Sequence, residues 1–246
     1  MQQAQLFVSG ELMSVEIEDV KPAIARPFPP LRQGDRLTQD EFLRRYNATP
    51  DVSHAELVEG VVYMPSPVSA TEHGEPHANL LTWLGVYKAR TPGVAVGDNS
   101  TLKLDADNAP QPDGYLRLIP ECGGQVRVAD GYLEGAPELV AEISASTASY
   151  DLHDKLNAYR RSGVREYVVW RVWDQAIDWF VLHEGRYERL PGSDDGIFRS
   201  RVFPGLWLDA RAMLNGDVEQ VLKTLETGLA SPEHAAFVER NRKAHE

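Results

Sequence analysis

The chain has 246 residues, of which 37 are Asp or Glu and 25 are Lys or Arg, so its net charge is −12. A hydrophobic content of 42% excludes a largely disordered chain, and the single Cys122 excludes a disulfide framework or a Cys-rich zinc module. No apolar run reaches the ~18 residues that a membrane helix needs, and the N-terminus lacks a signal-peptide pattern. These features predict a cytoplasmic protein without a membrane segment. The acidic balance argues against strong nonspecific binding to nucleic acid, because that binding depends on Lys and Arg.

Composition shifts along the chain predict three parts. Residues 1–36 form a proline-containing arm that should be extended, because proline fixes φ and lacks an N–H donor. The prolines are Pro22, Pro27, Pro29 and Pro30. A folded domain over 37–208 follows, beginning with the capping box Thr38 to Glu41 and a short helix. Residues 209–246 should form two or three helices, one of them starting at Ser231-Pro232.

The first half of the domain alternates short strands with one longer helix. We expect a strand over 55–64 with a bend at Gly60, broken by Pro65-Ser66-Pro67, and a helix over 72–90. One helical face would carry His73, His77, Leu80, Leu81, Leu84 and Lys88. Short strands are expected around 94–96, 101–104 and 113–116, followed by a turn at 121–124.

The sequence of the second half of the domain predicts a parallel crossover. A buried strand over 138–144 precedes a helix that ends at Ser162-Gly163, and a strong strand over 166–172 follows. Turns at 174–175 and 184–185 then connect strands over 177–182 and 186–190 in an antiparallel meander. A strand–helix–strand unit beside hairpins indicates an α/β fold with a mixed central sheet flanked by helices.

Three ionisable residues break the pattern of their own segments. Glu142 lies among residues typical of a buried strand, unless that strand is an edge strand whose Glu138, Glu142 and Ser144 face solvent. Lys155 falls on the apolar stripe of its helix, where it either snorkels to solvent or points into a site. Asp113 starts a strand, although Asp-Gly is also a common turn.

Together these residues suit metal-dependent phosphodiester chemistry. Two carboxylates on neighbouring strands can converge on one Mg²⁺ ion, which prefers oxygen ligands. A nearby lysine can stabilise charge on the phosphate or orient the attacking water.

An ordered set of stretches resembles the Uma-two-type restriction endonucleases of the PD-(D/E)XK nuclease superfamily. The resemblance covers about 37–208. Its stretches are Thr38 to Phe42, Glu56 to Gly60, Met64 to Pro67 with His73, Pro112-Asp113, Glu142 to Ser146, Lys155 with Tyr159, and Gly163 to Tyr167.

The resemblance implies a restriction-endonuclease-like fold and hydrolysis of nucleic acid, DNA above all, with Mg²⁺ or Mn²⁺. Asp113 and Glu142 would be metal ligands, the Ile143 carbonyl a third ligand, and Glu56 an auxiliary carboxylate. The superfamily motif normally has its lysine two residues after the glutamate, where this chain has Ser144. Lys155 would be the migrated replacement. His73 and Ser144 would line the site.

Other patterns have weaker functional interpretations. His73 and His77 have a spacing that can bind zinc on a helix, but the adjacent catalytic Glu is missing. Asp151, His153 and Asp154 could add carboxylates to the site, but they face away from the apolar stripe and are interpreted as solvated surface. Trp170, Trp173, Trp179 and Trp207 are interpreted as core, with Trp173, beside a turn, the one that could be exposed.

The leading hypothesis is therefore a metal-dependent endonuclease, with homodimerisation suggested by the need to cut two strands. The alternative is a catalytically silent nuclease-fold module that binds nucleic acid or protein. A third hypothesis is a structural or regulatory protein that dimerises through its terminal segments.

Overall fold

The computed structural model describes residues 6–8, 11–13, 28–64, 69–193 and 195–245. The predictions for Pro22, Pro27 and Pro65-Ser66-Pro67 lie outside these residues. Within them, Pro29 and Pro30 are non-helical, as the arm prediction requires. Two short strands, β1 (Leu6–Val8) and β2 (Glu11–Met13), pair antiparallel.

The centre of the fold is a mixed six-stranded sheet in the order β13-β12-β11-β10-β7-β5. The strands are β5 (Val94–Gly97), β7 (Gly114–Leu118), β10 (Leu139–Ser144), β11 (Glu166–Arg171), β12 (Ala176–His183) and β13 (Arg186–Arg189). β10 and β11 are parallel, and every other neighbouring pair in this sheet is antiparallel. The predicted crossover and meander are confirmed, and with them the α/β fold class.

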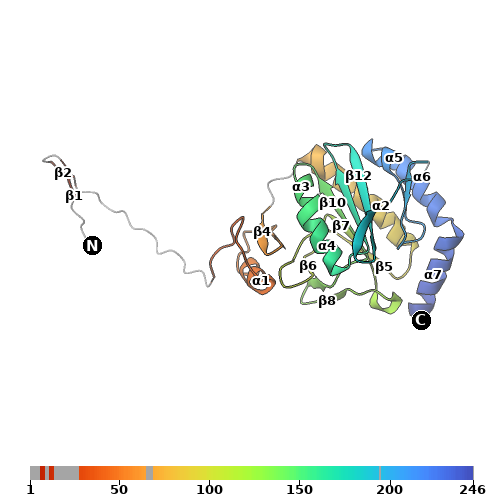
Figure 1. Cartoon of the computed structure of the whole chain (residues 1–246), viewed down its shortest axis with the longest axis horizontal. Coiled ribbons are helices and arrows are strands. Elements are labelled where there is room, and N and C mark those ends of the chain that lie inside the picture. The colour runs from red at the N-terminus through yellow and green to blue at the C-terminus, as the bar shows by residue number, and fades with distance from the viewer. Residues whose placement is uncertain (1–5, 9–10, 14–27, 65–68, 194, 246) are drawn as a thin grey trace.

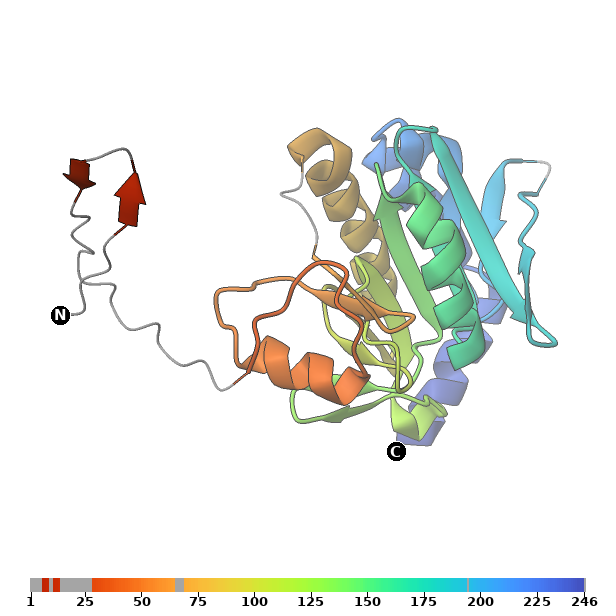
Figure 2. The same cartoon turned by 60° about the vertical axis from the view of Figure 1, so that its left-hand side comes forward.

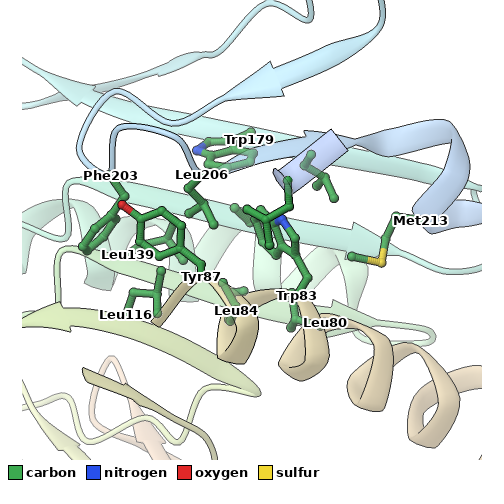
Figure 3. Packing of buried hydrophobic residues seen from close by; sticks show 14 of the residues in the cluster. Leu80, Trp83, Leu84, Tyr87, Leu116, Leu139, Trp179, Phe203, Leu206 and Met213 are labelled. Carbon is green, nitrogen blue, oxygen red and sulfur yellow. The ribbon is translucent and has the colours of Figure 1, made fainter. Parts of the chain in front are cut away.

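Helices cover both faces of this sheet (Figures 1 and 2). On one face lies α2 (Glu75–Arg90), preceded by the π-helical turn η1 (Ala70–Gly74). Trp83 of α2 meets Trp179 of β12 edge to face, with ring centroids 6.0 Å apart, inside the largest apolar cluster (Figure 3). The predicted apolar face of α2 was wrong at Lys88, which is exposed, whereas Trp83 and Tyr87 are buried.

The opposite face carries the helical segment between β10 and β11. It consists of α3 (Ala148–Tyr150), the π-helical turn η3 (Asp151–Lys155) and α4 (Leu156–Ser162). Gly163 ends α4 with φ 87°, the left-handed conformation that was expected of it. Tyr159 of α4 packs on Tyr167 of β11, with ring centroids 5.0 Å apart. The crossover helix therefore begins at the end of β10 and is fixed directly against the sheet.

A smaller unit at the N-terminal side has its own apolar cluster, which includes Phe42 and Leu57. Its helix α1 (Gln39–Asn47) begins after Thr38, whose hydroxyl accepts from the Glu41 N–H at 3.4 Å. The strand predicted over 55–64 is instead a hairpin of β3 (Glu56–Val58) and β4 (Val61–Tyr63). Glu59 and Gly60 both have positive φ, which is the geometry of a tight two-residue hairpin turn.

A second small sheet contains β6 (Leu102–Lys103), β8 (Arg127–Ala129) and β9 (Tyr132–Glu134). β8 and β9 were not expected from the sequence. Asp130 and Gly131, which join them with positive φ, form the Asp-Gly hairpin signal that could have identified the pair. The turn expected at 121–124 includes the short 3₁₀ helix η2 (Pro120–Cys122).

The C-terminal part is helical, as predicted. After the hairpin of β14 (Ile197–Arg199) and β15 (Trp207–Asp209), the chain forms α5 (Ala210–Leu214), α6 (Val218–Leu229) and α7 (Pro232–His245). Ser231 accepts a hydrogen bond from the His234 N–H at 3.3 Å, in agreement with its expected capping role. In the described parts of the chain, no helix combines the length and the apolarity required to cross a membrane.

Candidate active site

Asp113 and Glu142 come from adjacent strands of the central sheet. The antiparallel register of β7 and β10 pairs Gly114 with Ala141, which places Asp113 opposite Glu142 at the end of β10. Asp113 Oδ2 accepts a hydrogen bond from the Ile143 N–H at 2.8 Å, so this side chain is fixed to the neighbouring strand. The structure therefore brings these two sequence-predicted carboxylates to one end of the sheet.

Glu142 lies in the interior of the molecule. β10 is flanked by β7 and β11, and the residue is only 4% exposed, so the edge-strand interpretation was wrong. Its Oε1 accepts hydrogen bonds from Lys155 Nζ at 3.0 Å and from the Tyr159 hydroxyl at 2.7 Å. Burial raises the pKa of Glu142 well above its usual value, while the positive charge of Lys155 opposes that rise.

Lys155 does not snorkel to solvent, because it is 5% exposed and its ammonium group lies among carboxylates. Besides Glu142, its Nζ lies 3.0 Å from Glu56 Oε1 and 3.8 Å from Asp151 Oδ1. Burial lowers the pKa of Lys155, but these three carboxylates more than offset that effect and raise the pKa well above its usual value. The surrounding carboxylates therefore favour the protonated form of Lys155.

Glu56 reaches the site from the small N-terminal unit, at the first position of β3. Its Oε1 accepts a hydrogen bond from the Gln111 N–H at 2.6 Å, two residues before Asp113. The predicted auxiliary carboxylate thus contacts Lys155, and it comes from the small N-terminal unit and not from the central sheet. The backbone segment that leads into β7 fixes its orientation.

Asp151 also belongs to this cluster, so the prediction that it lies on the solvated surface was wrong. Its Oδ2 accepts hydrogen bonds from Ser144 Oγ at 2.5 Å and from Thr147 Oγ1 at 2.7 Å. Asp151 precedes Lys155 by four residues, and the π-helical turn η3 keeps both side chains on the buried side. His153 and Asp154 of the same turn are exposed, as predicted.

Ser144 and His73, the two residues predicted to line the site, do lie beside it. Ser144 holds Asp151, as described above. His73 Nε2 lies 3.2 Å from Asp113 Oδ1. The hydrogen bond to Asp113 raises the pKa of His73; burial opposes this rise and the Ile143 carbonyl adds to it. For Asp113, burial raises the carboxyl pKa, but His73 and the Ile143 N–H outweigh burial and lower it below its usual value.

The pair His73 and His77 does not assemble a zinc site. His77 Nε2 instead lies 2.7 Å from the Asp113 carbonyl oxygen and 3.8 Å from Asp98 Oδ2. Among the residues that the structure describes, no group of three or more His, Cys, Asp or Glu side chains is arranged to hold a metal ion. A metal site here would therefore use two carboxylates and the backbone.

The donor set of Asp113, Glu142 and the Ile143 carbonyl fits a hard divalent ion. All three supply oxygen, and Mg²⁺ is commonly bound through only one or two carboxylates while it keeps several waters. The electrostatics agree, because the four buried carboxyl groups Glu56, Asp113, Glu142 and Asp151 outnumber the one lysine and the one imidazole beside them, Lys155 and His73. A buried surplus of negative charge is costly, and a bound cation relieves that cost.

Tyr159 is the site residue whose role the sequence analysis missed. Its position suggested only an apolar contact, and it does pack in the cluster that contains Tyr167. Its hydroxyl nevertheless reaches Glu142, because the helical segment that begins after β10 packs back along the sheet and brings α4 over Glu142. A tyrosine four residues after a buried lysine is the signal that could have indicated this second donor.

Comparisons with known proteins concern the fold and the family of the chain. A search of solved structures found a protein described as "a putative nuclease belonging to DUF820 from Anabaena variabilis ATCC 29413". It is similar to this chain with a TM-score of 0.53 and 14% identity, over 72% of this chain and 99% of that one, which shows a shared fold. No curated protein matches the chain. The family model Uma2, described as "Putative restriction endonuclease", matches residues 39–211, and the chain belongs to this family.

Proposed function

We propose that the protein is an endonuclease that hydrolyses phosphodiester bonds of DNA with Mg²⁺ or Mn²⁺. The observation that carries the proposal is the position of Asp113 opposite Glu142, with Lys155 buried between Glu142 and Glu56. Membership of a nuclease family supports nucleic acid as the substrate. Restriction-endonuclease-like proteins generally use divalent metals, which supports the cofactor.

Asp113, Glu142 and the Ile143 carbonyl would hold the ion. When bound, the divalent ion supplies Lewis-acid stabilisation of phosphate charge and lowers the pKa of water. Asp113 is suited to bind a metal ion because its lowered pKa favours the ionised carboxylate. The hydrogen bond from the Ile143 N–H keeps the Asp113 carboxylate at the sheet end, and the backbone of β10 keeps the Ile143 carbonyl in place.

Lys155 would offset the negative charge that develops on the phosphate during hydrolysis. Its three carboxylate neighbours keep it protonated, and Glu56 and Asp151 hold its ammonium group beside Glu142. Tyr159 donates to the same oxygen of Glu142 and fixes the rotamer of that side chain. His73, next to Asp113 Oδ1, would orient a substrate phosphate or the Asp113 carboxylate.

A nuclease assay tests the proposal. Purified protein is incubated with single- and double-stranded DNA and RNA in Mg²⁺, Mn²⁺ or EDTA, beside Asp113→Asn and an exposed control, Glu239→Gln. We expect cleavage of DNA in the presence of either metal, no cleavage in EDTA, and loss of cleavage in Asp113→Asn alone. Cleavage that persists in EDTA or in Asp113→Asn would overturn the proposal.

Metal binding is tested independently of cleavage. A ligand that binds only the folded state raises the unfolding temperature by mass action. We expect Mn²⁺ to raise this temperature for wild type and for Glu239→Gln, but not for Asp113→Asn. Cleavage without metal binding would exclude the assigned ligands, and metal-independent DNA binding without cleavage would favour the catalytically silent module. We also propose that the protein is a homodimer in the cytoplasm. Light scattering of the purified protein measures its mass and so tests the dimer.

A further inference from the structure

Trp173 is exposed at the turn between β11 and β12. Of the large hydrophobic residues that the structure describes, only Trp173 and Val128 are strongly exposed, each at 61%. By contrast, Trp83, Trp170 and Trp179 are buried in the core. An exposed tryptophan on a well-packed domain is a candidate contact residue, because its large apolar ring otherwise faces water.

The register of the sheet places Trp173 at the same end as the candidate active site. β10 and β11 are parallel, Ile143 pairs with Trp170, and the Val172 N–H donates to the Ser144 carbonyl at 2.8 Å. Trp173 therefore lies in the turn just beyond the end of β11, three residues after the partner of Ile143. In both overall views the β11–β12 turn lies at the same end of the sheet as the start of α2, α3 and α5 (Figures 1 and 2).

Ion pairs and a hydrogen bond brace the turn that carries Trp173. Arg171 forms ion pairs with Asp174 and with Asp178, the latter at 2.8 Å. Gln175 Nε2 donates to the Val172 carbonyl at 2.9 Å, which closes the turn. The acidic groups beside Trp173 are therefore paired with arginine, and they repel a phosphate backbone less than free carboxylates would.

A groove of about 510 Å³ begins at the same turn. Its lining includes Gln175, Ala176, Ile177, Phe198, Arg211 and Asn215. Arg211, on α5, is exposed and forms no ion pair with any acidic residue in the described part of the chain. The groove opens on the α2 side of the sheet, whereas Glu142 faces α4. A nucleic-acid strand that occupied both the groove and the candidate active site would therefore pass over the ends of β10 and β11.

From these observations we infer that the protein takes a single-stranded or locally unpaired substrate, with Trp173 stacking on a base near the cut and Arg211 binding a backbone phosphate. The inference rests on the proposed nuclease function. Bases within a duplex stack on one another, so only an unpaired base offers a whole face to an indole ring. An arginine in the adjoining groove supplies the positive charge that phosphates require, and this contact stays local despite the net charge of −12.

Binding of labelled single-stranded DNA, and of the duplex of the same sequence, tests the inference by fluorescence anisotropy in EDTA. Trp173→Ala should weaken binding of the single strand about 5- to 150-fold, the range of base–aromatic stacking. Trp173→Phe should restore most of this affinity, since a phenyl ring also stacks. The matched control is Val128→Ala, which removes the other strongly exposed apolar side chain, on a separate sheet.

Arg211 is tested through the salt dependence of binding. Each phosphate contact contributes about 0.7 to the slope of log affinity against log salt concentration for single strands. Arg211→Ala should reduce this slope by about one contact, whereas Arg242→Ala, at the exposed end of α7, should leave it unchanged.

The outcomes separate this inference from the proposed function. Cleavage and single-strand binding that are both unchanged in Trp173→Ala would reject the inference and leave the nuclease proposal intact. Trp173-dependent binding without cleavage in any metal would reject the nuclease and keep the binding role. Equal losses for duplex and single strand would contradict the substrate class. Conversion of a dimer to a monomer in Trp173→Ala, with DNA binding unchanged, would assign Trp173 to a protein interface instead.

Discussion

Lys155 Nζ donates to Glu142 Oε1 at 3.0 Å, and neither residue is more than 5% exposed. Only the short helix α3 separates the strand that carries Glu142 from the π-helical turn that carries Lys155. The ion pair therefore ties the helical crossover segment to β10 and contributes to the charge balance of the site. Because Glu56 and Asp151 surround the same ammonium group, loss of the lysine leaves several buried carboxylates without a cation.

Lys155→Met should both destabilise the protein and abolish cleavage. Removal of one partner of a buried ion pair costs about 3–5 kcal/mol of unfolding free energy, because the remaining charge is uncompensated. Denaturant titration measures this change. As a control, Lys223→Met removes an exposed lysine that pairs with Glu219 on α6, and it should leave both stability and cleavage unchanged. A Lys155→Met variant as stable as wild type would show that Glu142 and Glu56 do not depend on this cation.

Tyr159→Phe should reduce cleavage while the fold is retained. The change removes only the hydroxyl that donates to Glu142 at 2.7 Å, a bond to a charged group worth about 1.5–3 kcal/mol. Tyr187→Phe is the matched control, since the hydroxyl of this half-buried tyrosine donates at 2.9 Å to the Val164 carbonyl. Cleavage rates and unfolding curves of both variants provide the comparison. Equal rates for the two variants would mean that Tyr159 does not orient Glu142.

Glu166 should make the protein more stable in mild acid than at neutral pH. Burial raises its pKa from 4.5 to about 6, although Ser200 and the Arg201 N–H partly oppose the rise. The folded state therefore binds this proton more tightly than the unfolded state does. The resulting stability is fully present below pH 4.5 and is lost as the pH rises through about 6.

The effect amounts to about 2 kcal/mol, from 1.36 kcal/mol per unit of pKa shift. It appears as the difference in unfolding free energy between wild type and Glu166→Gln, measured across this pH range. As the pH falls, the unfolding free energy of wild type should rise relative to that of Glu166→Gln. A difference that does not vary with pH would contradict the raised pKa. The exposed Glu226→Gln variant controls for general effects of charge removal.

Gly228→Ala should destabilise the protein, although alanine is normally the better helix former. Gly228 lies inside α6, and an added Cβ would meet the Gly205 carbonyl and approach the Trp207 ring within 2.8 Å. Overpacking of this kind costs about 1–3 kcal/mol. Gly85→Ala in α2 has no atom within 4 Å of the new Cβ and should stabilise by up to about 1 kcal/mol. Thermal unfolding of the two variants should therefore shift in opposite directions.

The sequence predicted the positions of Glu142, Lys155 and Asp113 because each breaks a local rule. A charged residue inside an apolar strand or on an apolar helical stripe is visible from neighbouring residues alone. The parallel crossover was predictable for the same reason, since the strand and helix periodicities alternate within a short stretch. The catalytic and metal-binding roles of these residues remain predictions that the experiments above address.

Asp151 and Tyr159 could not be identified in this way because both obey local rules. An aspartate in the first turn of a helix is ordinary, and its burial depends on Ser144 and Lys155, which only the folded structure brings beside it. A tyrosine on an apolar stripe is equally ordinary. The contact between Glu56 and Lys155 joins segments far apart in the chain, so no local pattern specifies it.

The attachment of Glu56 to the small N-terminal unit has a consequence for the order of assembly. The sheet and its crossover can bring Asp113, Glu142 and Lys155 together before the β3–β4 hairpin docks. Docking is a long-range step, and such steps carry the largest entropic cost of chain closure. The ion pair of Glu56 with Lys155 joins the small N-terminal unit to the crossover segment, so the complete charge arrangement depends on the docking of these two parts.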